Sequence, residues 1–259
     1  MKKALYILLF FTGLSHLKAQ HIDVGVGLGL ANYWGDLSPN ISFGETKAAG
    51  NVFARLNFNN VWALTGQISV LEVSGNDKNF DFNKTRNLNF SSSIRELSGF
   101  FEYNFSSFGY GVLDKKVTGY IFGGFSYFQF NPITRYAGET VNLRDLKTEG
   151  VAYDKGAFAI PFGIGVKWIF ARNFSLEANY NIRKTYTDYI DDVSGKYVDL
   201  SATSIRTQQI ADRSYEVLGT SQYQPGSKRG SDNYNDWFMT VSASIAYRIP
   251  GRIKCPTFF

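Results

Sequence analysis

Charged side chains occur inside segments whose residues otherwise alternate between apolar and small or polar types. Glu96, Glu102, Lys167 and Glu177 stand on the polar side of that alternation, and Arg183 joins them near one segment end. Charges at such positions would be costly against lipid, whereas carboxylates and cations that face one another can pair and hydrogen-bond. We therefore expect a structural network of ion pairs rather than a proton or solute path, because an interior enclosed by about eight strands is filled by side chains.

A second group of charges lies close together in one long connection. Its members are Arg183, Lys184, Asp188, Tyr189, Asp191 and Asp192. Carboxylates in such a group can ligate Ca²⁺, but this spacing matches no defined calcium loop, and we expect no metal or other cofactor. Opposite charges near strand ends usually pair locally. The group either ties the long loops over the end of the fold or forms a surface that binds cargo or a neighbouring protein.

Histidine, the usual proton carrier of hydrolytic sites, occurs only twice. His16 lies within the predicted signal peptide, and His21 lies just after it. Ser-His and Cys-His catalysis and histidine-ligated zinc all require a positioned imidazole. We therefore expect that the chain is not an enzyme.

The N-terminus has the pattern of a secretory signal peptide, which we place at residues 1–19. Lys2 and Lys3 precede an apolar run, Ala4–Leu14, and Ala19 offers a cleavage site. The run of 11 residues is too short to span a membrane as a helix, although a short anchor helix is the alternative. Removal of Lys2, Lys3 and Lys18 lowers the formal charge from +5 to +2, so no nucleic-acid partner is expected.

Period-2 alternation of apolar residues predicts strands. Four segments show it strongly, namely 22–30, 160–168, 174–182 and 237–249, and four show it more weakly, namely 50–58, 62–72, 94–105 and 118–130. The strong segments have roughly the 9–11 residues that a tilted transmembrane strand needs. We predict an all-β fold, an eight-stranded antiparallel transmembrane β-barrel over residues 20–250, with a tail at 251–259. A soluble β-sandwich is the alternative.

The predicted connections alternate between short and long. The short ones lie near 59–61, 106–117 and 170–173, and the long ones near 33–49, 73–93, 131–157 and 183–236. Outer-membrane barrels have short periplasmic turns and long extracellular loops, and a sandwich has no reason to separate loop lengths in this way. We expect a protein in contact with outer-membrane lipid, with both termini in the periplasm.

Several strings resemble those of the PorG family, outer-membrane barrels associated with the type IX secretion system. They are Gly35-Asp36-Leu37, Thr148-Glu149-Gly150, residues 160–167, residues 183–194, Arg229-Gly230, Asn235-Asp236-Trp237 and Cys255-Pro256. The string at 183–194 is the most specific. The resemblance implies a non-enzymatic subunit that anchors or stabilises a periplasmic ring built from a lipoprotein and its partner. A general barrel with an envelope-structural or small-solute role is the alternative.

Cys255, the single cysteine, lies in the predicted periplasmic tail. An odd cysteine in an exported protein suggests intermolecular pairing, and nearby Arg252 and Lys254 favour the reactive thiolate. We predict a disulfide to a periplasmic subunit of the ring, with a shielded free thiol as the alternative.

Overall fold

The computed structural model describes residues 21–221 and 223–250. The predicted signal peptide at 1–19 and the predicted tail at 251–259, which contains Cys255, lie outside the described residues. The barrel strands are β1 (His21–Trp34), β2 (Lys47–Asn57), β3 (Trp62–Asn76), β4 (Asn89–Asn104), β5 (Val117–Tyr136), β7 (Gly156–Ala171), β8 (Phe174–Thr185) and β9 (Trp237–Ile249).

Short elements decorate the connections. They are η1 (Phe43–Glu45), η2 (Asp77–Asn79), η3 (Asp81–Asn83), β6 (Glu139–Asn142), α2 (Leu143–Leu146), α3 (Ile205–Ala211) and α4 (Tyr215–Leu218). Within the described ranges, every helix is too short or too polar to cross a bilayer.

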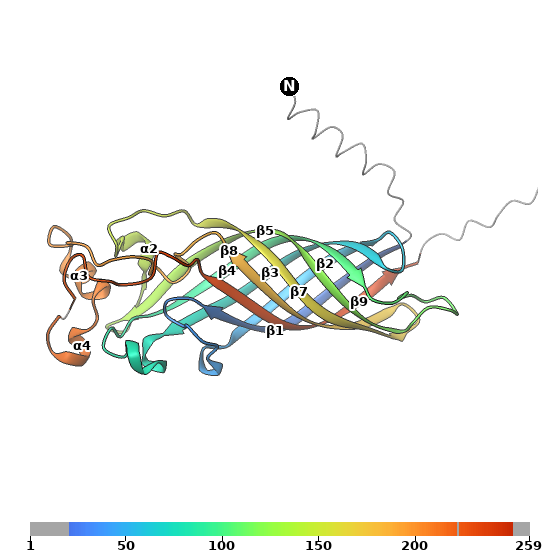
Figure 1. The fold of residues 1–259 in the computed structure, drawn as a ribbon, viewed down its shortest axis with the longest axis horizontal. Helices are drawn as coiled ribbons and strands as arrows, with labels where there is room; N and C mark the ends of the chain where they lie inside the picture. Colours follow the sequence, from blue (N-terminus) through green and yellow to red (C-terminus); the bar gives the residue numbers. More distant parts are fainter. Residues whose placement is uncertain (1–20, 222, 251–259) are drawn as a thin grey trace, which may run out of the picture.

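The sheet closes on itself. Each barrel strand pairs antiparallel with its sequence neighbour, β1 pairs with β9, and pairing of β4 with β5 completes the ring (Figure 1). The remaining strand, β6, lies outside the ring and pairs with residues 133–136 at the end of β5. The predicted eight-stranded antiparallel barrel is therefore confirmed. β5 runs further than the predicted 118–130 because its hairpin with β6 continues the pairing beyond the ring.

The period-2 pattern separates the two faces of each strand as predicted. On β4, Glu96 and Glu102 point inward and are buried, whereas Leu97 and Phe101 point outward and are exposed. The same alternation places the apolar side chains of β1 on the outer surface and its glycines on the inner one. A one-residue shift in register would exchange the faces, so the pattern specifies the pairing.

Connections of different length gather at opposite ends of the barrel. Residues 58–61, 105–116 and 172–173 form one end, and residues 35–46, 77–88, 137–155 and 186–236 form the other (Figure 1). We call these the short-turn end and the long-loop end. The predicted alternation of connection lengths holds, with boundaries moved by a few residues.

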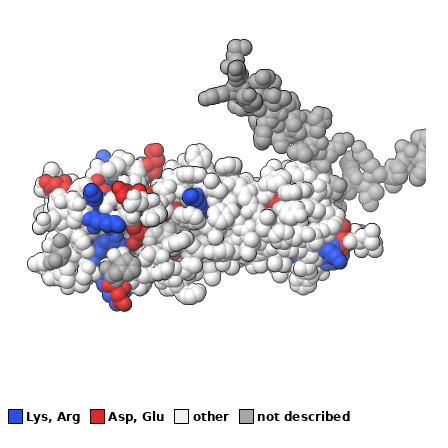
Figure 2. All heavy atoms as spheres, in the orientation of Figure 1, with Lys and Arg blue, Asp and Glu red and all other residues white. Residues whose placement is uncertain are grey.

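An apolar band surrounds the barrel between two sets of aromatic side chains. Trp34 and Trp237 lie 5.8 Å apart near the long-loop end, and Trp62 stacks on Phe101 near the short-turn end. Trp237 and Tyr247 lie ten residues apart on β9. At a strand tilt of about 40°, this spacing corresponds to a band about 25 Å tall along the barrel axis. Lys, Arg, Asp and Glu on the visible face gather mainly at the two ends (Figure 2). This is the outer surface of a barrel that contacts lipid.

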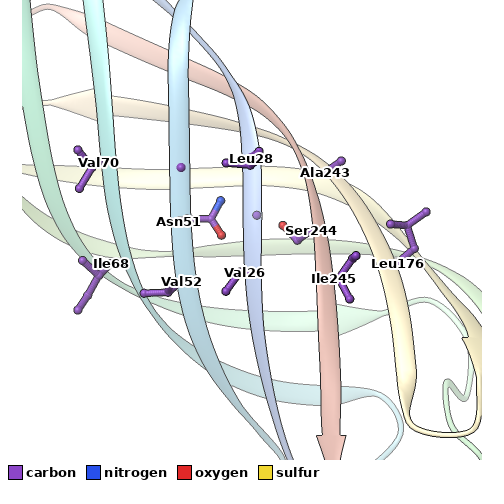
Figure 3. A pocket seen from close by; sticks show the side chains of 12 residues that line it. Val26, Leu28, Asn51, Val52, Ile68, Val70, Leu176, Ala243, Ser244 and Ile245 are labelled. Atoms are coloured by element: carbon purple, nitrogen blue, oxygen red, sulfur yellow. The ribbon is translucent and has the colours of Figure 1, made fainter.

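A groove of about 760 Å³ marks this band on strands β1, β2, β3, β8 and β9. Gly50 contributes no side chain to its lining, and outward residues such as Leu28, Val52, Ile68 and Ile245 form its walls (Figure 3). Its nearly wholly apolar lining belongs to the lipid-facing surface.

Candidate functional site

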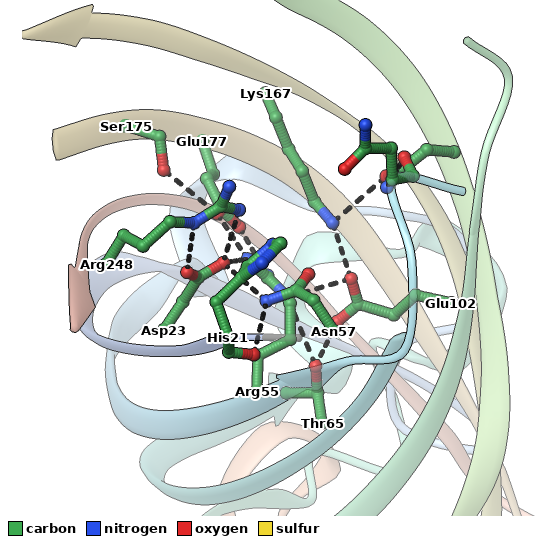
Figure 4. Close-up of polar contacts among 12 residues, drawn as sticks. His21, Asp23, Arg55, Asn57, Thr65, Glu102, Lys167, Ser175, Glu177 and Arg248 are labelled. Atoms are coloured by element: carbon green, nitrogen blue, oxygen red, sulfur yellow. Dashed lines mark hydrogen bonds and ion pairs between the residues drawn. The ribbon is translucent and has the colours of Figure 1, made fainter. Parts of the chain in front are cut away.

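Ion pairs fill the interior at the level of the apolar band. Arg55 on β2 donates to both carboxylate oxygens of Glu177 on β8, at 2.6 and 2.7 Å. Arg55 also lies 3.0 Å from Glu102 on β4, which accepts a hydrogen bond from Lys167 of β7 at 2.6 Å (Figure 4). One guanidinium and one ammonium group thus join strands from both halves of the barrel.

Two further pairs extend this network along the barrel axis. Arg248 donates to Asp23 at 2.8 Å toward the short-turn end, and Arg183 lies 3.0 Å from Glu96 toward the long-loop end. Counted with the central group, four cations face four carboxylates: Arg55, Lys167, Arg183 and Arg248 against Asp23, Glu96, Glu102 and Glu177. Charge balance and direct contacts offset the cost of burying these groups.

The interior leaves little free space beside this network. A cavity of about 20 Å³ remains among side chains that include Phe53, Phe100 and Tyr120, which is room for about one water molecule. The side chain of Lys167 also lies over the Tyr120 ring, 4.1 Å from its centroid. At this level, the described part of the barrel is packed rather than open.

The predicted interior charges all point into the barrel, but the centre of their network was not predicted. Arg55 lies on the inward-facing side of the weak alternation at 50–58, two residues after Phe53. That position in the pattern could have identified Arg55 as an interior charge. Asp23 stands among glycines on the inward face of β1, and it pairs with Arg248. The partner of Glu177 is therefore Arg55, and that of Glu102 is both Arg55 and Lys167.

The segment 188–194, directly after β8, closes the mouth of the barrel at the long-loop end. Ile190 and Val193 are almost completely buried and belong to one core with Phe128 and Phe238, which point inward from β5 and β9. The backbone N–H of Ile190 donates to the Asp236 carboxylate at 2.9 Å. We call the segment 188–194 the plug.

Two buried carboxyl groups, one in the plug and one just before β9, share one hydroxyl. Tyr33 Oη lies 2.7 Å from Asp191 Oδ2 and 2.5 Å from Asp236 Oδ1. A tyrosine hydroxyl has one proton, so it donates to one carboxylate, and the second short contact requires a carboxylic acid that donates to the tyrosine oxygen. The geometry therefore favours at least one protonated carboxyl group.

The electrostatics of the mouth agree with that geometry. Burial raises the pKa of Asp236 to about 8, and burial together with the neighbouring Asp236 charge raises the pKa of Asp188 to about 9. Burial likewise raises the pKa of Asp191 far above its ordinary value, and the charges of Asp236 and Asp36 add to the effect. The raised pKa values of Asp236 and Asp188 favour their protonated forms at neutral pH.

Arginines bind the long loops to one another around the plug. Arg229 donates to Glu149 at 2.9 Å and to the backbone oxygen of Asp192 at 2.5 Å. Arg86 pairs with Asp77 at 2.6 Å and donates to the backbone oxygens of Asp36 and Arg229. All four long connections contribute to this linkage.

The predicted loop cluster is only partly one group. Asp188, Asp191 and Asp192 lie in the plug, and Tyr189 stacks on Tyr153 with centroids 4.5 Å apart. Arg183 and Lys184 do not join them, since both lie in β8 and successive strand residues point to opposite faces. Arg183 reaches Glu96 inside the barrel, whereas exposed Lys184 lies over the Trp237 ring. The inclusion of Arg183 and Lys184 was wrong for that reason.

The acidic residues of the mouth pair mainly with hydroxyls, backbone N–H groups and arginines. Asp192, for example, accepts from Thr148 at 2.5 Å and from Tyr153 at 2.6 Å. Among the residues that the structure describes, no set of three or more His, Cys, Asp or Glu is arranged to hold a metal ion. Of the two interpretations of the cluster, a tie between loops or a binding surface, these contacts correspond to loops tied over the mouth. Tyr33, Arg86 and Arg229 were not predicted to contribute.

Sequence comparison matches residues 2–219 to a family described as "Domain of unknown function (DUF6089)". No curated protein matches the chain.

Solved structures with a similar fold include outer-membrane proteins. Neisserial surface protein A is 9% identical, with 88% of this chain and 97% of that chain covered and a TM-score of 0.46. OprG from Pseudomonas aeruginosa is 9% identical, with 90% and 98% covered and a TM-score of 0.46. Ail of Yersinia pestis, in complex with the heparin analogue sucrose octasulfate, is 10% identical, with 89% and 100% covered and a TM-score of 0.42.

Proposed function

We propose that this chain, which belongs to the DUF6089 family, is a non-enzymatic outer-membrane subunit of the type IX protein secretion system. In this proposal the barrel anchors or stabilises a periplasmic ring built from a lipoprotein and its partner. The short-turn end and both termini face the periplasm, and the long-loop end faces outward.

The proposal rests on the observation that the barrel interior is packed and that distinct structures form at its two ends. The interior is filled with ion pairs, and the plug closes the mouth. A barrel of this kind acts through surfaces at its ends rather than through a wide channel. The strings that resemble the PorG family also converge, since Asp36, Glu149, Arg229 and Asp236 all contribute to the linked mouth.

The short-turn end carries a hydrogen-bonded turn with exposed apolar side chains, which is suited to a periplasmic partner. Val112 and Leu113, at the tip of the turn 105–116, are almost completely exposed. Asp114 fixes the turn by accepting hydrogen bonds from Asn60 at 2.7 Å and from the backbone N–H of Gly111 at 2.9 Å. An apolar pair held on an ordered turn loses little conformational freedom on binding, which favours its use as an anchor point.

Affinity purification in mild detergent from the native bacterium tests the proposal. The wild-type barrel should recover the ring lipoprotein and its partner, and Val112→Asn with Leu113→Asn should reduce that recovery. Val217→Asn with Leu218→Asn provides a matched control, because it changes an exposed Val-Leu pair at the opposite end.

A clean deletion provides the second arm of this test. Secretion of type IX cargo should stop while permeability to small solutes stays unchanged. Normal secretion, in cells that express no related barrel, would contradict the assembly role. It would favour the alternative, a general barrel with an envelope-structural or small-solute role.

A further inference from the structure

A cavity of about 420 Å³ opens at the long-loop end, at the edge of the apolar band. Side chains from the end of β1, the start of β9 and the loops beside them form it: Trp34, Asp36, Pro39, Ser231, Tyr234, Asn235 and Trp237. The volume lies within the range of roughly 300–1,000 Å³ that is usual for small-molecule sites. The ion-pair network and the plug do not use this cavity.

Three aromatic rings provide its apolar walls. The Trp34 and Trp237 rings are inclined at 58° to one another, and Tyr234 extends from the loop with most of its surface exposed. The aromatic group at the short-turn end differs, since Trp62 stacks on Phe101 at 5.1 Å and contacts Tyr103 at 4.6 Å with the rings inclined at 54°. Trp62 packs on these neighbouring rings and is 40% exposed, whereas Trp34 and Trp237 line the hollow.

Polar groups converge on the same hollow from the loops. Asp36 Oδ2 accepts the backbone N–H of Ser231 at 2.8 Å, which fixes the carboxylate at the cavity wall. The amide of Asn235 is exposed beside it and offers both a donor and an acceptor. Flat aromatic faces beside a carboxylate and an amide match the two surfaces of a sugar ring, its C–H face and its hydroxyl edge.

We propose that this cavity binds a neutral saccharide ring, with Trp34 and Tyr234 stacking on its C–H face and Asp36 and Asn235 hydrogen-bonding to its hydroxyls. Asp36 disfavours sulfated or phosphorylated sugars, because the residues that line the cavity include no Lys or Arg to bind the anionic group. The position at the edge of the lipid band is compatible with two sources of the same chemistry. These are the sugar headgroup of a glycolipid and a soluble glycan.

Titration calorimetry on the full-length protein in lauryldimethylamine oxide, a sugar-free detergent, tests the site. The probes are maltotetraose, mannotetraose and chitotetraose, and one of them should bind. Trp34→Ala and Tyr234→Ala should each weaken binding roughly three- to tenfold, the usual range for loss of one aromatic contact. Trp62→Ala, which removes a comparable tryptophan at the other end, should leave it unchanged.

Nanodiscs separate the two sources. Discs that contain digalactosyl diacylglycerol, compared with phosphatidylcholine discs, should show lipid retention that depends on Tyr234 if the source is a glycolipid. Binding of a soluble tetrasaccharide without such retention would identify a soluble glycan. Failure of every tetrasaccharide and of the glycolipid to bind would overturn the proposal, as would binding by Trp34→Ala and Tyr234→Ala that equals that of the wild type. Binding of an unglycosylated peptide at this cavity in their place would also overturn it. None of these outcomes depends on recovery of the secretion ring.

Discussion

The barrel interior and the mouth bury similar carboxyl groups but stabilise them by different means. In the interior, each of the four carboxylates directly contacts an arginine or lysine side chain. At the mouth, Asp191 and Asp236 share a tyrosine hydroxyl, and the nearby Asp188 adds a third carboxyl group. The first arrangement depends on opposite charges, and the second depends on protons.

The difference follows from what surrounds each region. Strands in the lipid band have a fixed register, so an arginine can be held in position against carboxylates from several strands. The plug is a single segment between loops, and its carboxyls lie close to one another, which raises their pKa values through burial and mutual repulsion. The interior should therefore respond to loss of a cation, and the mouth should respond to pH.

Removal of Arg55 should have the largest effect. Arg55→Met leaves Glu177 without its two short hydrogen bonds and removes a cation from Glu102 and Asp23. Breaking a buried pair in this way costs about 3–5 kcal/mol. Urea unfolding, followed by the heat-dependent gel shift of the folded barrel, measures the loss.

Arg95→Met is the matched control, because Arg95 is exposed on the outer face of β4. It should leave the free energy of unfolding unchanged or slightly increased. Equal stability of the wild type and Arg55→Met would show that the interior network does not depend on this guanidinium group.

The sequence predicted the ring of strands better than it predicted the contacts inside it. Alternation at 22–30 and 237–249 reports directly which side chains face lipid, because each strand has one apolar side. Contacts such as Arg55 with Glu177 depend on closure of the barrel, which brings together residues far apart in the chain. The mouth was harder still, since Arg183 and Lys184 are neighbours in sequence yet lie on opposite faces of β8.

The stability of the closed mouth should decrease as the pH rises. Asp236 has a pKa of about 8 in the closed state, whereas an exposed aspartate titrates near pH ~4. Between these values the open state releases a proton that the closed state retains. The free energy of opening therefore falls by up to about 1.4 kcal/mol per pH unit for each such carboxyl. The closed mouth is most stable at acidic pH, and the contribution of Asp236 levels off above its closed-state pKa.

Hydrogen exchange of the plug amides, corrected for the intrinsic rate at each pH, measures this opening. Asp236→Asn should reduce the pH dependence by the contribution of one proton. The asparagine oxygen can accept from Ile190 N–H while its NH₂ donates to Tyr33, as the protonated acid does. Asp232→Asn, an exposed change in the same loop, should have no effect. The explanation fails if the parent and Asp236→Asn show the same slope.

Removal of the shared Tyr33 hydroxyl should have the smallest effect of these changes, and it should act on the mouth without disturbing the interior. Burial raises the pKa of both Asp191 and Asp236, and the Tyr33 hydroxyl opposes that rise by donating a hydrogen bond. Tyr33→Phe should therefore extend the pH-dependent range upward and lower the free energy of opening by about 1 kcal/mol. The unfolding of the barrel should barely change, because the interior ion pairs stay intact. Plug hydrogen exchange against pH provides the measurement, with exposed Tyr186→Phe as the control. An unchanged pH range would mean that the two carboxyls do not share the hydroxyl.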